Sequence, residues 1–152
     1  MNLNPDFRDL LTVFESFGVR YVVVGAYALA AHGVPRFTAD LDLFVEPTPE
    51  NAERILGSLQ EFGFGGLGLA KDDLCREDVV IRFAEPPRQI DLLTSISGVD
   101  FAAAWSERFL VPVSENLAIP FLSRNLLIKN KAASRRTKDL ADLELLRKKE
   151  NP

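Results

Sequence analysis

The chain contains a single cysteine, Cys75, and a single histidine, His32. One cysteine cannot form a disulfide within the chain, and one histidine cannot assemble a zinc site of the His/Cys type. These shortages exclude secreted disulfide scaffolds and zinc hydrolases of that type. His32 lies beside Gly33 at the end of a predicted helix, where we expect it to cap or pack rather than to catalyse.

Long apolar runs are also missing. No run approaches the roughly 18 apolar residues that cross a bilayer. Residues 1–6 lack the basic start and the apolar stretch of a secretory signal. We therefore expect a cytoplasmic protein with no membrane partner.

Two common nucleotide motifs are absent or misplaced. The sequence has no G-x-x-x-x-G-K-[ST], which excludes a P-loop. The string GFGGLG at 63–68 matches G-x-G-x-x-G, but it follows a predicted helix and does not connect a strand to a helix. A dinucleotide site there is not expected.

The composition is that of one globular domain. The 152 residues are 47% hydrophobic and 26% charged, and they include 11 Phe, which is enough to form a core. The charge is unevenly distributed: residues 1–122 hold 9 Lys/Arg against 18 Asp/Glu, and residues 123–152 hold 9 against 4. We expect a single domain over 1–152, with a core at about 5–122 and basic helices at about 123–148. The basic segment is either a polyanion contact or a solvated surface.

Hydrophobic periodicity predicts alternating helices and strands. The predicted helices lie at 5 to about 18, 26–31, about 49–62, 101–105, 123–134 and 137–148. The predicted strands lie at 20–24, 41–45, 79–83, 89–94 and 109–113, with an extended piece at 117–121. The segments 79–83 and 89–94 are expected to pair antiparallel. The fold class is therefore α/β or α+β, with a mixed sheet of four or five strands flanked by helices.

Three acidic residues stand out within the predicted strands. Asp40 and Asp42 are two apart, so they share a face about 6 to 7 Å apart along the backbone. Asp91 lies between Ile90 and Leu92 and can join them if the strands are adjacent. Each acid alone fits the solvent face of a strand, but three carboxylates packed together repel unless they are protonated, hydrated or bridged by a metal ion. The trio therefore favours a site for divalent cations.

A glycine turn precedes the acids. Gly25 and Ala26 lie where the strand 20–24 meets a helix, a position at which backbone N–H groups can bind phosphate. Alone, this turn is weak evidence. Its position before the acids makes it a candidate phosphate site.

Two segments resemble a known family. An apolar strand, a glycine turn, Asp-x-Asp and a later Asp resemble nucleotidyltransferases of the DNA polymerase β type. Residues 25–42, GAYALAAHGVPRFTADLD, are similar to the branch that contains abortive-infection, type IV toxin nucleotidyltransferases. Residues 129–142, KNKAASRRTKDLAD, resemble the closing motif of that branch. The resemblance spans about 21–146 and implies a nucleotidyltransferase-like fold with two C-terminal helices.

The resemblance also implies roles for individual residues. Asp40, Asp42 and Asp91 would be catalytic and hold the metal, Mg²⁺ or Mn²⁺, with Asp91 also a candidate general base. The implied nucleotide-binding residues are Gly25, Ala26, Lys131, Arg135 and Lys138. Arg36 and Thr38 lie just before the acids, where they either bind phosphate of the nucleotide or hold the loop. The family usually has Gly or Ser at the position of Ala26, which keeps the N–H but has no hydroxyl. Asp139 and Asp142 are expected to orient Lys or Arg side chains.

The sequence thus predicts a metal-dependent enzyme that transfers a nucleoside monophosphate from an NTP to a hydroxyl. The acceptor is left open between RNA such as transfer RNA, a protein and a small molecule. A role in a toxin–antitoxin or phage-defence system, with a cognate antitoxin or other partner protein, is implied by the resemblance. The alternatives are a non-catalytic nucleotide-binding or antitoxin-like protein and a small RNA-binding module.

Overall fold

A six-stranded mixed β-sheet forms the centre of the computed structural model, which describes residues 3–38, 40–65, 68–85 and 87–149. The strands are β1 (Tyr21–Val24), β2 (Leu41–Val45), β3 (Val80–Phe83), β4 (Ile90–Leu93), β5 (Phe109–Ser114) and β6 (Leu117–Phe121). Their spatial order is β3-β4-β2-β1-β6-β5. The expected count of four or five strands is wrong, because the extended piece 117–121 pairs with both β1 and β5 and so joins the sheet as β6.

The strand pairs are of both kinds. β1 runs parallel to β6 and β2 runs parallel to β4, whereas the pairs β1/β2, β3/β4 and β5/β6 are antiparallel. The expected antiparallel pairing of 79–83 with 89–94 is confirmed, with Phe83 opposite Ile90. The end of β1 consequently lies beside the starts of β2 and β4.

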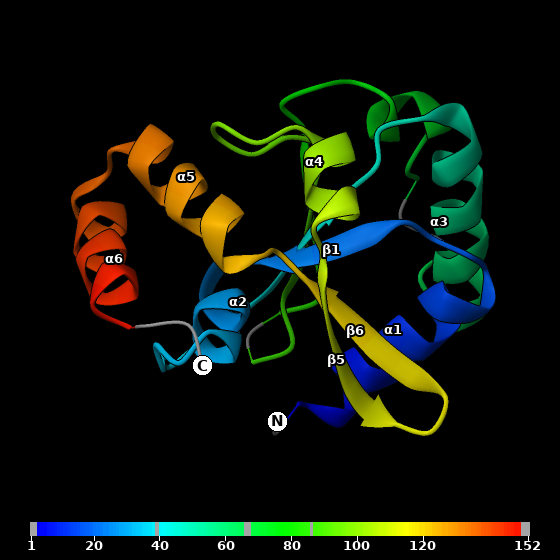
Figure 1. Ribbon diagram of the computed structural model, residues 1–152. Coiled ribbons are helices and arrows are strands. Elements are labelled where there is room, and N and C mark those ends of the chain that lie inside the picture. Colours follow the sequence, from blue (N-terminus) through cyan, green and yellow to red (C-terminus); the bar gives the residue numbers. More distant parts are fainter. Residues whose placement is uncertain (1–2, 39, 66–67, 86, 150–152) are drawn as a thin grey trace.

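Helices surround this sheet (Figure 1). They are α1 (Pro5–Ser16), α2 (Gly25–Ala31), α3 (Pro49–Phe62), α4 (Phe101–Ser106), α5 (Arg124–Ser134) and α6 (Thr137–Lys148), with a 3₁₀ turn, η2, at Lys71–Leu74. Polar caps fix several starts: the side chains of Asn4, Thr48 and Ser123 accept hydrogen bonds from backbone N–H groups of the first turn. No helix of the described residues has the length and apolarity to span a membrane.

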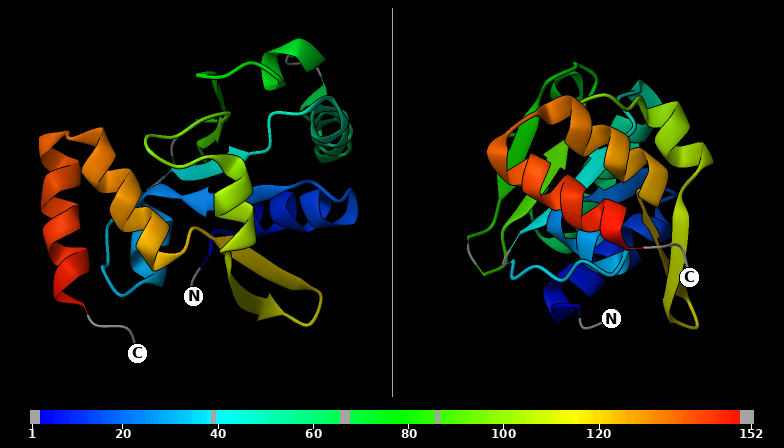
Figure 2. Two further views of the ribbon diagram at one scale, coloured as in Figure 1. Left: turned by 45° about the horizontal axis from the view of Figure 1, so that its top comes forward. Right: turned by 60° about the vertical axis from the view of Figure 1, so that its left-hand side comes forward.

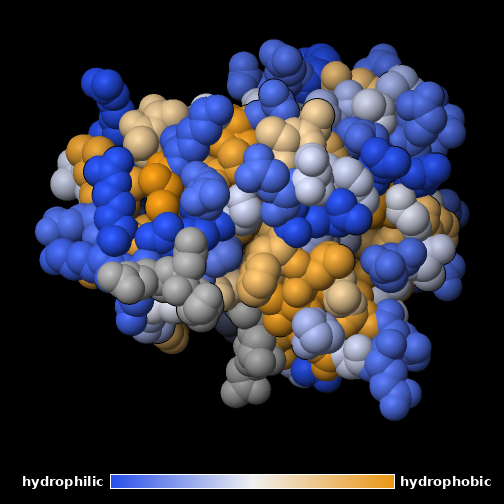
Figure 3. Space-filling view, viewed as in Figure 1, coloured by the Kyte–Doolittle hydropathy of each residue, from blue (hydrophilic) through white to orange (hydrophobic). Residues whose placement is uncertain are grey.

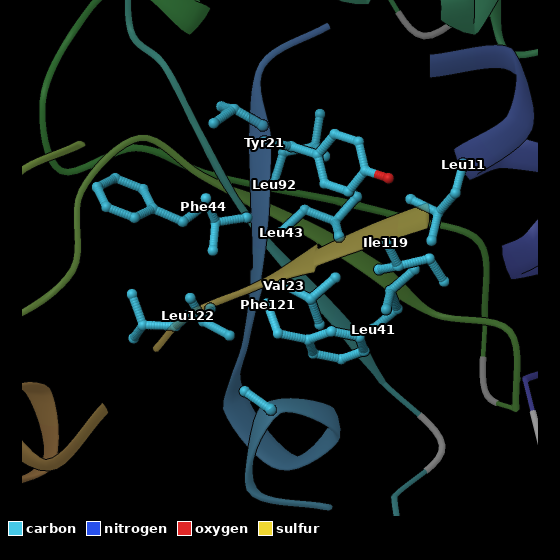
Figure 4. Close-up of a cluster of buried hydrophobic side chains, with 14 of the residues drawn as sticks. Leu11, Tyr21, Val23, Leu41, Leu43, Phe44, Leu92, Ile119, Phe121 and Leu122 are labelled. Atoms are coloured by element: carbon cyan, nitrogen blue, oxygen red, sulfur yellow. The ribbon is translucent and has the colours of Figure 1, made fainter. Parts of the chain in front are cut away.

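The two faces of the sheet are covered by different helices. Phe14 of α1 packs edge-on against Tyr21 of β1, with ring centroids 5.7 Å apart. On the opposite face, Phe101 of α4 packs against Phe44 of β2 at 5.2 Å. Phe44 is therefore buried, and β2 is not the half-buried strand that its alternating sequence suggests. Buried side chains such as Tyr21, Leu43 and Leu92 form a hydrophobic cluster around the central strands (Figure 4).

The helices α5 and α6 pack against each other at one end of the molecule, next to α2 (Figures 1 and 2). Between them Arg135 adopts a left-handed conformation, φ 56°, which ends α5. Lys131 and Lys138 therefore belong to two separate helices. The amide of Asn130 in α5 donates to the carbonyl of Ser97 at 2.9 Å and ties the pair to the core.

Candidate active site

Asp42 and Asp91 lie side by side at the end of the sheet where β1 stops and β2 and β4 start. Asp42 is in register with Asp91 on one side and with Val24 on the other. Residues paired in register on neighbouring strands point to the same face of a sheet. The structure thus brings together two of the three predicted acids.

Asp40 immediately precedes β2. Its backbone N–H donates to the Thr38 hydroxyl at 2.7 Å, so Thr38 shapes the turn that leads into the acids. The carboxylate of Asp40 is near enough to Asp42 to raise the pKa of Asp42. All three acids therefore share one electrostatic environment.

Asp42 holds the most perturbed carboxyl group of the three. Burial, followed by the charges of Asp91 and Asp40, raises its pKa to about 6, and the charges of Lys131 and Lys138 act in the opposite direction. Within the described residues, no hydrogen bond to its carboxylate is found. Negative charge at this point is thus poorly compensated by the protein itself.

Gly25 makes the close approach of Asp42 possible. Its φ is +71°, and a Cβ at this position would lie 2.3 Å from Oδ2 of Asp42. A side chain here would have to adopt an unfavourable backbone conformation and displace the carboxylate. The predicted glycine turn is therefore in contact with the predicted acids.

A cavity of about 330 Å³ adjoins this contact, and we name it the polar pocket. The sheet and the loop after β4 contribute Val24, Gly25, Asp42, Leu93, Ile96 and Ser97, and the C-terminal helices contribute Asn130, Lys131, Ser134, Arg136 and Asp139. The helices thus supply cationic and hydroxyl groups opposite the acids.

Lys131 reaches the polar pocket from a buried ion network. Its ammonium group lies 3.0 Å from Asp139 and 3.5 Å from Asp142, two carboxylates that are almost fully buried. Burial raises the pKa of Asp139, but hydrogen bonds from Arg136, Ser134 and Lys131 outweigh it and hold that pKa well below its usual range. As expected, Asp139 and Asp142 orient cationic side chains.

Asp91 is clamped by neighbours that the sequence analysis did not identify. Arg82 of β3 donates to both of its carboxylate oxygens, at 3.0 and 3.2 Å, and Gln89 lies 3.4 Å from one of them. The predicted hairpin contains the signal, because placing Phe83 opposite Ile90 puts Arg82 opposite Asp91. No pattern in the sequence predicts that Asn130 and Ser97 line the polar pocket.

The other predicted nucleotide-binding residues are dispersed. Arg36 forms an ion pair with Asp142 of α6. Lys138 is exposed but lies near enough to Asp42 to lower its pKa. Arg135 is exposed and does not line the polar pocket, and Ala26 lines a different cavity.

The donor set fits a hard divalent cation in chemistry and charge, although not as a closed cage. Asp42 and Asp91 offer carboxylate oxygens, and a cation would offset the burial and the like charges that raise the pKa of Asp42. In the described part of the chain, no three His, Cys, Asp or Glu side chains are arranged to hold a metal ion. Mg²⁺ is commonly held by one or two carboxylates together with substrate phosphates, so two carboxylates suffice.

Comparison with known proteins supports the fold. No protein-family model matches the sequence, and no curated protein matches it. Among solved structures, a putative nucleotidyltransferase from Thermotoga maritima aligns with a TM-score of 0.57 over 97% of this chain and 94% of that one, at 19% identity. The chain therefore has a nucleotidyltransferase-like fold.

Proposed function

We propose that the protein is a nucleotidyltransferase that moves a nucleoside monophosphate from an NTP to a hydroxyl acceptor. The observation that carries the proposal is the in-register pair Asp42 and Asp91, in contact with Gly25 and facing a pocket that contains Lys131. Buried like charges are costly in a fold, and a site that binds cations and phosphates gives them a purpose.

The acids and the lysines would have different roles in the reaction. Asp40, Asp42 and Asp91 would hold Mg²⁺ or Mn²⁺, which when bound neutralises charge on the phosphates. The acceptor oxygen bonds to the α-phosphorus, the bond from that phosphorus to the bridging oxygen breaks, and pyrophosphate leaves with the electron pair. Lys131 and Lys138 of the C-terminal helices would neutralise charge on the leaving phosphates.

The hydroxyl proton needs an acceptor. Asp91 is the expected base, but both of its oxygens accept hydrogen bonds from Arg82. Proton uptake by Asp91 therefore requires Arg82 to release one oxygen. Arg82 is exposed and sits on an edge strand, so its side chain has room to move.

Label transfer tests this function. The protein is incubated with each α-labelled NTP, Mg²⁺ or Mn²⁺, and a total RNA and protein extract, and labelled macromolecules are identified. We expect transfer that Asp42→Asn abolishes and that Asp9→Asn, an exposed acid on α1, leaves intact. Absence of label with every NTP, or label that persists in Asp42→Asn, contradicts the proposal.

The resemblance to type IV toxins gives a finer version of the proposal. If the transfer acts on a cellular RNA or protein, induced expression in a bacterial host is expected to arrest growth, and Asp42→Asn is expected to abolish the arrest. Growth arrest that survives Asp42→Asn excludes a nucleotidyltransferase toxin. Salt-dependent RNA binding without transfer instead indicates a binding module.

A further inference from the structure

A second cavity adjoins the glycine turn at Ala26 and shares no lining residue with the polar pocket. It encloses about 640 Å³, within the usual range for sites that bind small molecules. Its lining comes from α2, the loop before the acids and β5: Ala26, Tyr27, Ala30, Ala31, Arg36, Phe37, Thr38, Phe109 and Val111. We name it the aromatic pocket.

Two phenylalanines of this pocket are exposed to solvent. Phe37 is fully exposed at 103%, and Phe109 is 44% exposed. Exposed aromatic rings that line a concavity mark a site for an apolar or planar partner. Apolar side chains also reach the surface where Figure 1 places β5 and β6 (Figure 3).

The ring of Phe109 is held in place by a neighbouring side chain in the absence of ligand. The ring of Phe109 packs on the ring of His32, with centroids 5.3 Å apart. A ring nitrogen of His32 lies 2.8 Å from the carbonyl of Leu122 and donates to it. His32 therefore has the packing role that its position predicts, and it holds Phe109 at the pocket edge.

Polar side chains also line the aromatic pocket. Arg36 is held by its ion pair with Asp142, and Thr38 accepts the N–H of Asp40. Burial and the charge of Asp40 raise the pKa of the Tyr27 hydroxyl. A ligand in this pocket would thus have hydrogen-bonding partners and would end beside Asp40.

A basic residue lies close to the end of α2, whose last residues line the aromatic pocket. The aliphatic stem of Lys149 lies 3.8 Å from the position of a Cβ on Gly33, two residues after α2 ends. Residues 123–152, to which Lys149 belongs, carry 9 Lys/Arg and 4 Asp/Glu. The surroundings therefore favour a ligand that carries phosphate.

We infer that the aromatic pocket binds a nucleobase, stacked against Phe37 and Phe109, of a phosphate-bearing ligand. Flat rings stack on aromatic side chains, and the neighbouring cations suit the phosphates of either a free nucleotide or the end of a single-stranded nucleic acid. The inference rests on the proposed function only for the subsequent nucleotidyl transfer, because binding of the base does not itself require transfer.

Binding without turnover tests the inference. Short fluorescent single-stranded RNA is titrated in EDTA and followed by anisotropy, and nucleoside monophosphates are titrated separately by calorimetry. Phe37→Ala and Phe109→Ala are each expected to weaken binding about tenfold, since stacking on one aromatic contributes that much or more. Phe37→Trp is expected to retain it.

The controls lie on the same strand and elsewhere on the surface. Leu110→Ala removes a side chain that is 51% exposed on β5 outside the pocket, and Phe17→Ala removes a 38% exposed ring at the end of α1, also outside the pocket. Both are expected to bind as the wild type does. Equal affinity for Phe37→Ala and wild type, an equal loss in Leu110→Ala, or no measurable binding of either ligand overturns the inference.

Comparing the RNA with the nucleoside monophosphates shows whether the bound base belongs to a nucleic acid end or to a free nucleotide. The label-transfer assay then tests the proposed function independently of base binding. Loss confined to the oligonucleotide identifies an acceptor end, and loss confined to the monophosphate identifies a free nucleotide. Base binding that depends on Phe37 in a protein with no transferase activity would sustain the pocket and reject the enzyme. Transferase activity together with unchanged ligand binding in Phe37→Ala and Phe109→Ala would support the proposed function and reject the aromatic pocket as the base-binding site.

Discussion

Asp42 carries a charge that the unliganded fold tolerates poorly. Its pKa in the folded protein is about 6, against 3.8 ordinarily, so the unfolded chain ionises more readily. The contribution of this group to stability is therefore fully present below about pH 4 and is lost as the pH rises through about 6. We expect Asp42→Asn to stabilise the metal-free protein by about 2 kcal/mol at pH 7.5.

The measurement is urea unfolding in EDTA at pH 7.5 and pH 5. The advantage of Asp42→Asn over wild type is expected to shrink at pH 5, because wild-type Asp42 is then largely protonated. Asp9→Asn serves as the control and is expected to show no such dependence. An Asp42→Asn variant that is less stable than wild type at pH 7.5 would mean that the carboxylate is compensated in the unliganded state.

Two glycines of nearly identical backbone conformation allow the contact at Gly25 to be isolated. Gly18 has φ +69° and Gly25 has φ +71°, but nothing lies within 4 Å of a Cβ on Gly18, whereas Asp42 would be 2.3 Å from one on Gly25. Gly18→Ala is expected to cost about 1 to 2 kcal/mol for the left-handed backbone alone. Gly25→Ala is expected to cost more and also to abolish label transfer, because Asp42 must move.

Thermal unfolding and the label-transfer assay are run on both variants. Similar stability losses with activity retained in Gly25→Ala would show that the Asp42 carboxylate can shift at no cost to the site.

The pairing of α6 with its surroundings depends on buried charge. Asp142 is fully buried and forms ion pairs with Lys131 of α5 and with Arg36 of the loop before the acids. Removing one member of a buried pair leaves the other uncompensated, so Asp142→Ala is expected to destabilise the protein by about 3 kcal/mol. Lys131→Met combined with Asp142→Leu is expected to recover part of that loss.

The exposed pair Glu144 and Lys148 on the same helix provides the comparison. Their charged atoms are 3.3 Å apart in solvent, and Glu144→Ala is expected to cost no more than about 0.5 kcal/mol in urea unfolding. Equal losses of stability in Asp142→Ala and Glu144→Ala would show that the buried ion pairs do not stabilise the packing of α6.

Local sequence predicts where helices and strands lie better than it predicts which of their side chains are buried. Asn4, Thr48 and Ser123 locate helix starts because a cap acts on its own first turn. The alternation of Leu41, Asp42 and Leu43 locates β2 and places the acid on the opposite face from its neighbours. Phe44 on that same face breaks the alternation, and it is buried because α4, more than fifty residues later in the chain, covers it.

The same limit applies to the candidate site. Asp40, Asp42 and Gly25 could be selected from spacing, since they lie within one strand–turn–helix–strand segment. The pairing of Lys131 with Asp139 and Asp142 depends on how two helices pack after the left-handed Arg135, which no periodicity reveals. The sequence therefore predicts the acids and underestimates how many of the cations near them are already paired.

The C-terminal helices and the sheet are expected to unfold together. Helices of 11 and 12 residues are marginal in water by themselves, and α5 and α6 bury Leu127 and Leu146. Emission of Trp105 in α4 reports on the core, and far-ultraviolet circular dichroism reports on all helices. We expect coincident urea transitions, as in a single cooperative domain. A helical transition that precedes the Trp105 transition would instead divide the chain near residue 122.

Ligand binding should reverse the order of stability set by Asp42. Mg²⁺ with an NTP at 100 times its dissociation constant is expected to stabilise the wild type by about 2.7 kcal/mol. Asp42→Asn, although more stable in EDTA, is expected to gain far less, because it offers one fewer charged ligand and no repulsion for the cation to relieve. Thermal unfolding of both proteins, with and without Mg²⁺ and NTP, measures the crossover. A merely damaged variant would be less stable in both conditions, and a binding site remote from Asp42 would give equal gains, so only the crossing of the two stabilities locates the cation at this carboxylate.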